Sequence, residues 1–162
     1  MFPLEIETLA RLLIDEVRER HLRVTTAESC TGGLVAAAIC SIPGASDVFE
    51  RGFITYTNRA KEEMLGIPGD MLADFGAVSE PVARMMAEGA LNHSRAHIAV
   101  AITGVAGPGG GSPMKPVGTV HIATARSTAG IRHRHEVFDG ETRLDVQLAA
   151  VAVALQMMRD AI

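Results

Sequence analysis

The chain has 162 residues, of which 48% are hydrophobic and 21% are charged. This length predicts a single domain over residues 1–162 that can bury a core. The formal net charge of −4 argues against nucleic acid as the main partner, because no basic excess is present to neutralise phosphates. No apolar run of about 18 residues is present, so we expect no membrane span. The acidic N-terminus also predicts no signal peptide.

Strands and helices alternate in the first half of the chain, as judged from the spacing of apolar residues. Asn58 is the expected N-cap of one short helix, and Gly66 is expected to end it. The predicted helices of this half cover residues 4–20, about 32–41, 58–65 and 68–75, and the predicted strands cover 23–28 and 52–57.

The second half is predicted to contain three successive strands between two helices. Ser79 is the expected cap of the first helix, with Pro81 in its first turn, and Ala129-Gly130 forms the expected hairpin turn. The predicted helices are 80–93 and 141–160, and the predicted strands are 97–103, 117–125 and 131–138. This order predicts the α/β class, with one three-layer α/β/α domain and a mixed β-sheet.

The two cysteines, Cys30 and Cys40, fall ten residues apart in and before one expected helix. That separation is too large for a disulfide. We therefore expect both to be reduced and buried, as is usual in a cytoplasmic protein. Aromatic residues make up only 4% of the chain, which leaves little material for stacking nucleic-acid bases.

A small hydroxyl residue, Ser29, lies between an expected strand and an expected helix, in the stretch Thr26–Gly33. The free N–H groups at the start of a helix can stabilise an anion, and Gly32 and Gly33 let the backbone approach a ligand closely. Two interpretations remain open from the local sequence. Ser29 is either a nucleophile at this corner or an ordinary helix cap.

A second loop, Thr103–Ser112, is dense in glycine and follows an apolar strand. It matches neither the P-loop nor the dinucleotide-binding glycine pattern. It is interpreted either as a flexible turn or as a cradle for a ligand. This loop and the corner at Ser29 both follow a predicted strand, so we expect them to form the two sides of an active site.

A nucleophilic serine needs a base, and no histidine lies beside either glycine cluster. His121 falls in the middle of a predicted strand, where a core or sheet-surface role is expected. Lys61 follows the next strand-to-helix corner, and adjacent corners of an α/β sheet meet at the strand ends. By itself, Lys61 is interpreted as a solvated helix residue.

Several unusual strings resemble the CinA C-terminal family, which includes stand-alone nicotinamide mononucleotide (NMN) deamidases. The resemblance covers about residues 5–160. The matching strings are Glu28–Gly33, Gly52–Tyr56 with Asn58 and Lys61, Gly76–Ser79, Ile102–Gly111 and Val117–Thr119. The resemblance implies hydrolysis of the carboxamide of NMN to nicotinate mononucleotide and ammonia, in pyridine nucleotide salvage. The N-terminal domain of longer members has no counterpart here, so its activities are not carried over.

The resemblance also implies roles for individual residues. Ser29 matches the nucleophile, Lys61 the base and Tyr56 an accompanying hydroxyl, without a metal or another cofactor. Thr103 matches a site residue. Arg143 matches the first arginine of the family's Arg-x-x-Val-Arg segment, but the second arginine is Gln147 here and one extra residue precedes Arg143.

This chemistry places demands on the site. Lys61 accepts a proton only when neutral, so its pKa must fall well below about 10.4, through burial and through the pyridinium cation of the substrate. Backbone N–H groups of Thr31, Gly32 and Gly33 are the expected oxyanion donors. The loop that begins at Gly104, together with Arg143, offers the donors for the 5′-phosphate.

Two other functions remain open from the sequence. One is a non-catalytic nucleotide-binding or regulatory module, and the other is an amidase for a different small carboxamide. The final helix also has an apolar face, which suits either a homo-oligomer or ordinary core packing. That face is formed by Leu148, Val151, Ala152 and Leu155.

Overall fold

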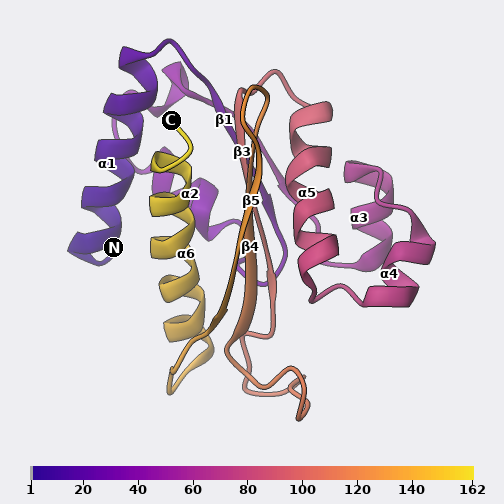
Figure 1. The fold of residues 1–162 in the computed structure, drawn as a ribbon. Helices are drawn as coiled ribbons and strands as arrows, with labels where there is room; N and C mark the ends of the chain where they lie inside the picture. The colour runs from indigo at the N-terminus through magenta and orange to yellow at the C-terminus, as the bar shows by residue number, and fades with distance from the viewer. Residues whose placement is uncertain (1) are drawn as a thin grey trace.

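A computed structural model describes residues 2–162 and has a central sheet between two layers of helices (Figure 1). The α/β/α class predicted from the sequence is confirmed. The helices are α1 (Leu4–Glu19), α2 (Leu34–Cys40), α3 (Asn58–Leu65), α4 (Gly69–Phe75), α5 (Glu80–Asn92) and α6 (Arg143–Arg159), with one 3₁₀ turn at Ala45–Asp47. The strands are β1 (Val24–Glu28), β2 (Phe49–Ile54), β3 (Ile98–Gly104), β4 (Thr119–Arg126) and β5 (Gly130–Val137).

The sheet is mixed, and its strand order is β2-β1-β3-β4-β5. Strand β1 pairs in parallel with both β2 and β3, whereas β3-β4 and β4-β5 are antiparallel. Because β1, β2 and β3 run the same way, their carboxyl ends meet at one edge of the sheet. The corners that follow β1 and β2 therefore lie next to each other.

The two faces of the sheet carry different side chains. Helices α1, α2 and α6 cover one face, and α5, α3 and α4 lie over the other (Figure 1). The first is called the branched face, because its strand residues are Val24, Ile98, Val100, Ile102, Val120 and Ile122. The second is called the alanine face, because its central strands contribute Ala27, Ala99, Ala101, Ala123 and Ala125.

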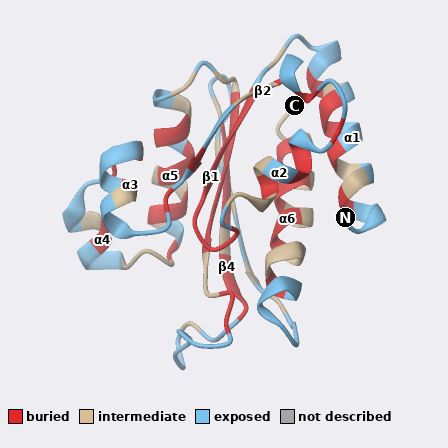
Figure 2. Ribbon diagram, turned by 180° about the vertical axis from the view of Figure 1, so that it is seen from behind, coloured by how far each residue is buried: buried red, intermediate tan, exposed pale blue. Residues whose placement is uncertain are grey.

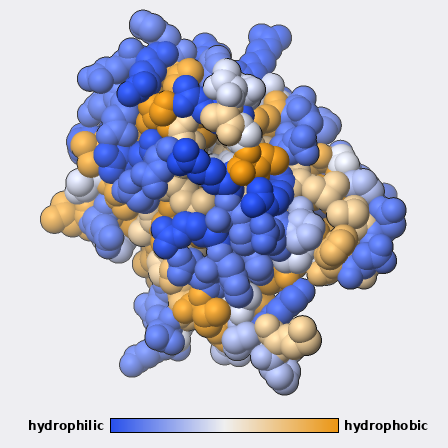
Figure 3. Space-filling view, viewed as in Figure 1, coloured by the Kyte–Doolittle hydropathy of each residue, from blue (hydrophilic) through white to orange (hydrophobic). Residues whose placement is uncertain are grey.

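Burial follows this layering. Figure 2 shows the central strands and the inner side of α5 buried, whereas most of the loop between β3 and β4 is exposed. The face of the molecule seen in Figure 3 is largely hydrophilic, with apolar side chains in separate small patches. None of the helices within residues 2–162 combines the length and the apolar character that a membrane span requires.

Two local predictions at the second corner were wrong. Strand β2 covers Phe49–Ile54 rather than 52–57, since the chain turns away toward α3 after Thr55. The N-cap of α3 is Thr57 rather than Asn58, because the Thr57 hydroxyl accepts the N–H of Ala60 at 3.1 Å. The shift places Asn58 as the first residue of the helix.

Helix α2 begins at Leu34, two residues later than expected. Gly32 and Gly33 have φ values of +57° and +102°, which are outside the range of an α-helix. These glycines therefore form a turn between β1 and the helix. Cys30 lies in this turn and is buried, whereas Cys40 at the end of α2 is exposed, so the prediction of burial was wrong for Cys40.

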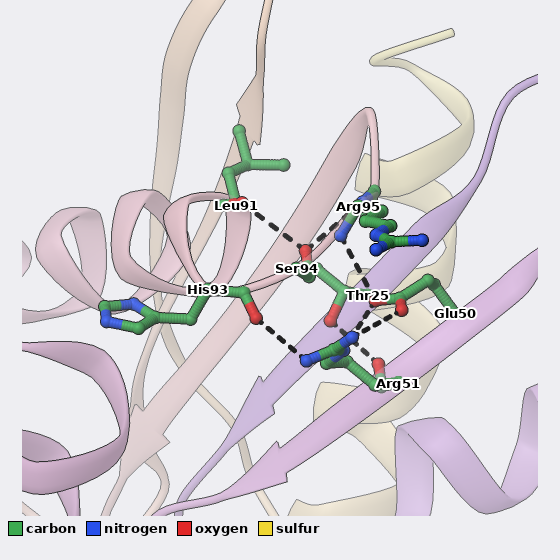
Figure 4. Close-up of polar contacts among 8 residues, drawn as sticks. Thr25, Glu50, Arg51, Leu91, His93, Ser94 and Arg95 are labelled. Carbon is green, nitrogen blue, oxygen red and sulfur yellow. Dashed lines mark hydrogen bonds and ion pairs between the residues drawn. The ribbon is translucent and has the colours of Figure 1, made fainter.

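The start of edge strand β2 is tied to the loop after α5 (Figure 4). Arg51 donates to the carbonyl oxygen of His93 at 3.1 Å and forms an ion pair with Glu50. The hydroxyl of Thr25 on β1 donates to the carbonyl oxygen of Arg51 at 2.7 Å. These contacts fix β2, and hence the corner that follows it, against the rest of the sheet.

Candidate active site

Ser29 and Lys61 come from the two neighbouring corners and meet inside the protein. The Ser29 Oγ and Lys61 Nζ atoms lie 3.0 Å apart, which is hydrogen-bond distance. Lys61 Nζ also donates to the carbonyl oxygen of Thr55 at 2.8 Å. The Lys61 residue is only 1% exposed, so the local interpretation of Lys61 as a solvated helix residue was wrong.

A pocket of about 300 Å³ opens beside this pair. Its walls combine the two corners with the end of β3, the glycine-rich loop, the segment before α5 and the start of α6. The lining residues are Ser29, Cys30, Tyr56, Asn58, Lys61, Ala77, Val78, Thr103, Gly104, Val105, Ala106, Gly107, Gly109, Gly110 and Arg143. Six residues singled out from the sequence are thus brought together: Ser29, Tyr56, Lys61, Thr103, Gly104 and Arg143.

The electrostatics of the pocket shift Lys61 toward its neutral form, and Arg143 supplies a positive charge. Burial lowers the pKa of Lys61 from its ordinary value. Burial also raises the pKa of Cys30 to about 12, so its thiol stays protonated and is a poor nucleophile at neutral pH. Lys61 and Arg143 line the pocket, and no Asp or Glu is among its lining residues.

Arg143 joins two sides of the pocket mouth. As the first residue of α6, it follows the N-cap Thr142, whose position is fixed by a capping box with Asp145. Its guanidinium donates to the Tyr56 hydroxyl and, at 2.6 Å, to the carbonyl oxygen of Gly107. The shifted segment therefore still brings Arg143 to the site.

Gln147 stands one turn further along α6, where the resembling family has its second arginine. Its side-chain amide donates to the carbonyl oxygen of Cys30 at 2.8 Å. The residue thereby braces the turn that carries Ser29, although it does not line the pocket.

Thr103 lines the pocket from the end of β3 and is almost fully buried. Its hydroxyl donates to the carbonyl oxygen of Ala77 at 2.8 Å, which ties β3 to the segment before α5. Ala77 and Val78 form part of the wall, and the sequence analysis did not single them out.

Thr31, Gly32 and Gly33, the expected oxyanion donors, are not among the residues that line the pocket. The N–H of Gly32 donates to the carbonyl oxygen of Ser29 at 3.0 Å, and the Thr31 hydroxyl donates to the Glu28 carboxylate at 2.8 Å. Within residues 2–162, the backbone N–H groups of Thr31 and Gly33 have no protein acceptor. The N–H groups of Thr31 and Gly33 are therefore the ones in this turn that are free to donate to a ligand.

Sequence reasoning missed Glu28. A signal for it existed, since Gly33 precedes α2 and supplies no capping side chain, so the first N–H groups of the helix need another acceptor. Glu28 is the carboxylate nearest to them in sequence.

No histidine lines the pocket. His121 lies opposite Thr103 in the sheet, stacks on His135 and has its Nδ1 3.0 Å from His133 Nε2. Of the two roles expected for His121, core or sheet surface, the structure shows a half-buried position on the sheet surface. Across residues 2–162, no group of three or more His, Cys, Asp or Glu side chains is arranged to hold a metal ion.

Fold and site together define a three-layer α/β protein with a serine and a buried lysine side by side at the carboxyl ends of parallel strands. The family model described as the CinA C-terminal domain matches residues 6–162. The chain belongs to this family, as the sequence motifs predicted.

The similar proteins include both short and long members. The nicotinamide-nucleotide amidohydrolase PncC of Escherichia coli K12 is 49% identical over 154 residues, covering 95% of this chain and 93% of the relative. A CinA-like protein of Akkermansia muciniphila is 56% identical over 118 residues, covering 73% of this chain but 28% of the relative. The chain spans between 28% and 39% of the length of several such longer relatives.

A solved structure has nearly the same fold. The competence/damage inducible protein CihA from Agrobacterium tumefaciens superposes with a TM-score of 0.97 at 50% identity, covering 99% of this chain and 97% of that chain.

Proposed function

We propose that this protein is an amidohydrolase that converts NMN and water to nicotinate mononucleotide and ammonia, in pyridine nucleotide salvage. The observation that supports it most is the 3.0 Å contact between Ser29 Oγ and Lys61 Nζ in a pocket with no carboxylate. The 49% identity to a nicotinamide-nucleotide amidohydrolase over nearly its whole length supports the choice of substrate.

The first step forms an acyl-enzyme. Neutral Lys61 takes the proton of the Ser29 hydroxyl while the oxygen attacks the carboxamide carbon, giving a tetrahedral intermediate. The lowered pKa of Lys61 favours the neutral amine that this step needs. The pyridinium ring of NMN withdraws electrons from the carboxamide, and its positive charge lowers the pKa of Lys61 further.

The intermediate carries its negative charge on the former carbonyl oxygen. The proposed donors are the backbone N–H groups of the turn 31–33, of which those of Thr31 and Gly33 have no protein acceptor. Tyr56, which lines the pocket, orients or relays the proton. The C–N bond then breaks as the proton on Lys61 passes to the leaving ammonia.

The second step releases the product. Lys61, neutral again, takes a proton from a water molecule whose oxygen attacks the ester carbon. The bond between the ester carbon and Ser29 Oγ breaks, and the proton returns to that oxygen. The proposed cycle uses Ser29 and Lys61 and needs no metal ion or other cofactor.

The phosphate of the substrate needs donors at the pocket mouth. Arg143 supplies a guanidinium there, and Gly104, Gly107, Gly109 and Gly110 line the pocket with backbone. Arg143 is bonded to Tyr56 and Gly107 in the structure, so a bound phosphate would exchange one of these contacts for its own.

Ammonia release from NMN, nicotinamide and glutamine, assayed in parallel, tests this function against the two alternatives. The proposal predicts release from NMN above the other two. Tight NMN binding without product would favour the regulatory module, and release from another carboxamide alone would favour a different amidase.

Substitution of the pair tests the mechanism. Ser29→Ala is expected to abolish ammonia release, and Lys61→Ala to lower turnover by several orders of magnitude, because the nucleophile or its base is lost. Ser41→Ala at the exposed end of α2 is the control and keeps full turnover. Near-normal turnover in either of the first two variants would remove the role proposed for that residue, and inhibition by a chelator would contradict a metal-free cycle.

The pH dependence of the rate tests the base. Because only neutral Lys61 is active, kcat/KM is expected to rise with pH and to level off above the Lys61 pKa. Since burial lowers that pKa, the inflection lies below the ordinary value of 10.5. Lys61→Arg, which stays charged, removes the rise together with the activity. A rate independent of pH in the unaltered protein would contradict Lys61 as the base.

A further inference from the structure

Glu28 is a carboxylate that is completely buried next to the proposed nucleophile. Its exposed fraction is 0%, yet its hydrogen bonds to the described residues, 2–162, include no cationic partner. Oε1 accepts the Thr31 hydroxyl at 2.8 Å and the N–H of Val35 at 2.9 Å, and Oε2 accepts the N–H of Ala36 at 3.0 Å. Three donors from one short segment therefore surround the carboxylate.

These contacts replace a missing helix cap. The residue before α2 is Gly33, which has no side chain to accept the first N–H groups of the helix. Glu28 reaches them from the end of β1 instead. Because α2 starts inside the protein, with Val35 completely buried, these N–H groups would otherwise lose hydrogen bonds to water without replacement.

The backbone of Glu28 is connected to the lysine. Its carbonyl oxygen accepts the N–H of Thr55 at 2.8 Å, and the carbonyl oxygen of Thr55 accepts Lys61 Nζ at 2.8 Å. Side chains of successive strand residues point to opposite faces. Glu28 therefore holds α2 on the branched face, while the next residue, Ser29, meets Lys61 on the alanine face.

We propose that Glu28 is a positioning residue for the Ser29–Lys61 pair, an inference that rests on the proposed function. Its carboxylate clamps the turn 29–33 to α2, which keeps Ser29 Oγ within reach of Lys61 Nζ and keeps the turn's backbone donors in place. Since Glu28 occupies the N–H groups at the start of α2, the substrate's phosphate binds at the pocket mouth and not at this helix.

Glu28→Gln tests the proposal with little change in shape. The amide group of glutamine is a donor, so at least one of the three donors around position 28 loses its acceptor. A displacement of about 1 Å at a reacting group costs on the order of a hundredfold in rate. We expect kcat on NMN to fall about 10- to 100-fold per folded molecule. KM and the pH inflection of the rate are expected to stay unchanged, because neither the pocket mouth nor Lys61 burial is altered.

The control is Glu16→Gln, which breaks the contacts of Glu16 with Arg159 on the far side of the branched layer. It is expected to keep kcat. Hydrogen exchange of the Val35 and Ala36 amides provides a local readout, and exchange is expected to accelerate in Glu28→Gln only.

Unchanged kcat in folded Glu28→Gln would overturn the proposal. A loss of activity that only follows the folded fraction would overturn it as well. If the unaltered protein releases no ammonia from NMN, the proposed function fails. The labelling rate of Ser29 by a fluorophosphonate then decides the positioning role, which predicts at least a tenfold slower reaction in Glu28→Gln.

Discussion

On the branched face of the sheet, valine and isoleucine side chains fill a thick layer between the strands and three helices. On the alanine face, the strand residues are alanines, whose small side chains let α5 pack closely. The buried positions of α5 include Ala83, Ala87 and Gly89, which are small as well. The central strand residues of both faces are fully buried. They differ in what close packing achieves, since the Ser29–Lys61 pair of the proposed site lies on the alanine side, whereas Cys30, Ala106 and Arg143 reach the pocket from the branched side.

Close packing on the alanine face places backbone next to backbone. The segment before α5 reaches Thr103, and the last turn of α3 lies against Gly89. Lys61 stands one turn before this contact. The branched face provides stability and the clamp on α2, whereas the alanine face sets the position of Lys61 relative to Ser29. Substitutions on the two faces are therefore expected to separate stability from turnover.

The largest effect on stability is expected from Leu155→Ala on the branched side. Leu155 is completely buried on α6, and its truncation leaves a cavity. The free energy of unfolding is expected to fall by about 2–5 kcal/mol, as measured by urea denaturation. Ammonia release per folded molecule is expected to stay near that of the unaltered protein, and a large loss there would contradict the separation of the two faces.

Gly89→Ala tests the alanine side with a single added methyl group. The new Cβ would lie 2.3 Å from the carbonyl oxygen of Leu65 and 3.0 Å from its Cβ, so α3 or α5 must shift. The free energy of unfolding is expected to fall by about 1–3 kcal/mol in spite of the better helix propensity of alanine. Turnover per folded molecule is also expected to fall, because the shift moves Lys61.

Glu88→Ala, at an exposed position of the same helix, is the control for Gly89→Ala. It is expected to leave both stability and turnover nearly unchanged. If Gly89→Ala instead keeps full turnover, the last turn of α3 does not determine the position of Lys61.

The fold was largely predictable, because apolar periodicity together with capping and turn residues marked most of the helices and strands. The errors occurred where contacts decide the boundaries. Strand β2 begins at Phe49 because Phe49 pairs with Val24, a contact between distant parts of the chain that no local pattern contains. The N-cap is Thr57 rather than Asn58, although both residue types are suitable caps. The place where the chain turns after β2 determines which of the two precedes the helix.

The site was predictable to a different degree. The family motifs pointed to Ser29 and Lys61, whereas their local sequence by itself favoured an ordinary helix cap and a solvated lysine. Only the parallel pairing of β1 with β2 brings the two residues together. Glu28 was missed because two of the groups that donate to its carboxylate are the backbone N–H groups of Val35 and Ala36. Any residue type supplies such a group, so the sequence does not mark the contact.

The smallest effects concern two buried threonines on β1 that point to opposite faces. The Thr26 hydroxyl on the branched face has no hydrogen-bond partner within residues 2–162. A buried hydroxyl without a partner costs stability. Thr26→Val, which has nearly the same shape, is therefore expected to raise the free energy of unfolding by about 1 kcal/mol in urea denaturation, with turnover unchanged.

Thr25→Val is the matched variant, because Thr25 is equally buried but donates to the carbonyl oxygen of Arg51 (Figure 4). Losing this hydrogen bond is expected to lower the free energy of unfolding by about 1 kcal/mol. The same substitution at adjacent residues thus has opposite signs, since one hydroxyl is used and the other is not. Equal effects at both positions would mean that strand propensity or volume, rather than hydrogen bonding, sets the stability of β1.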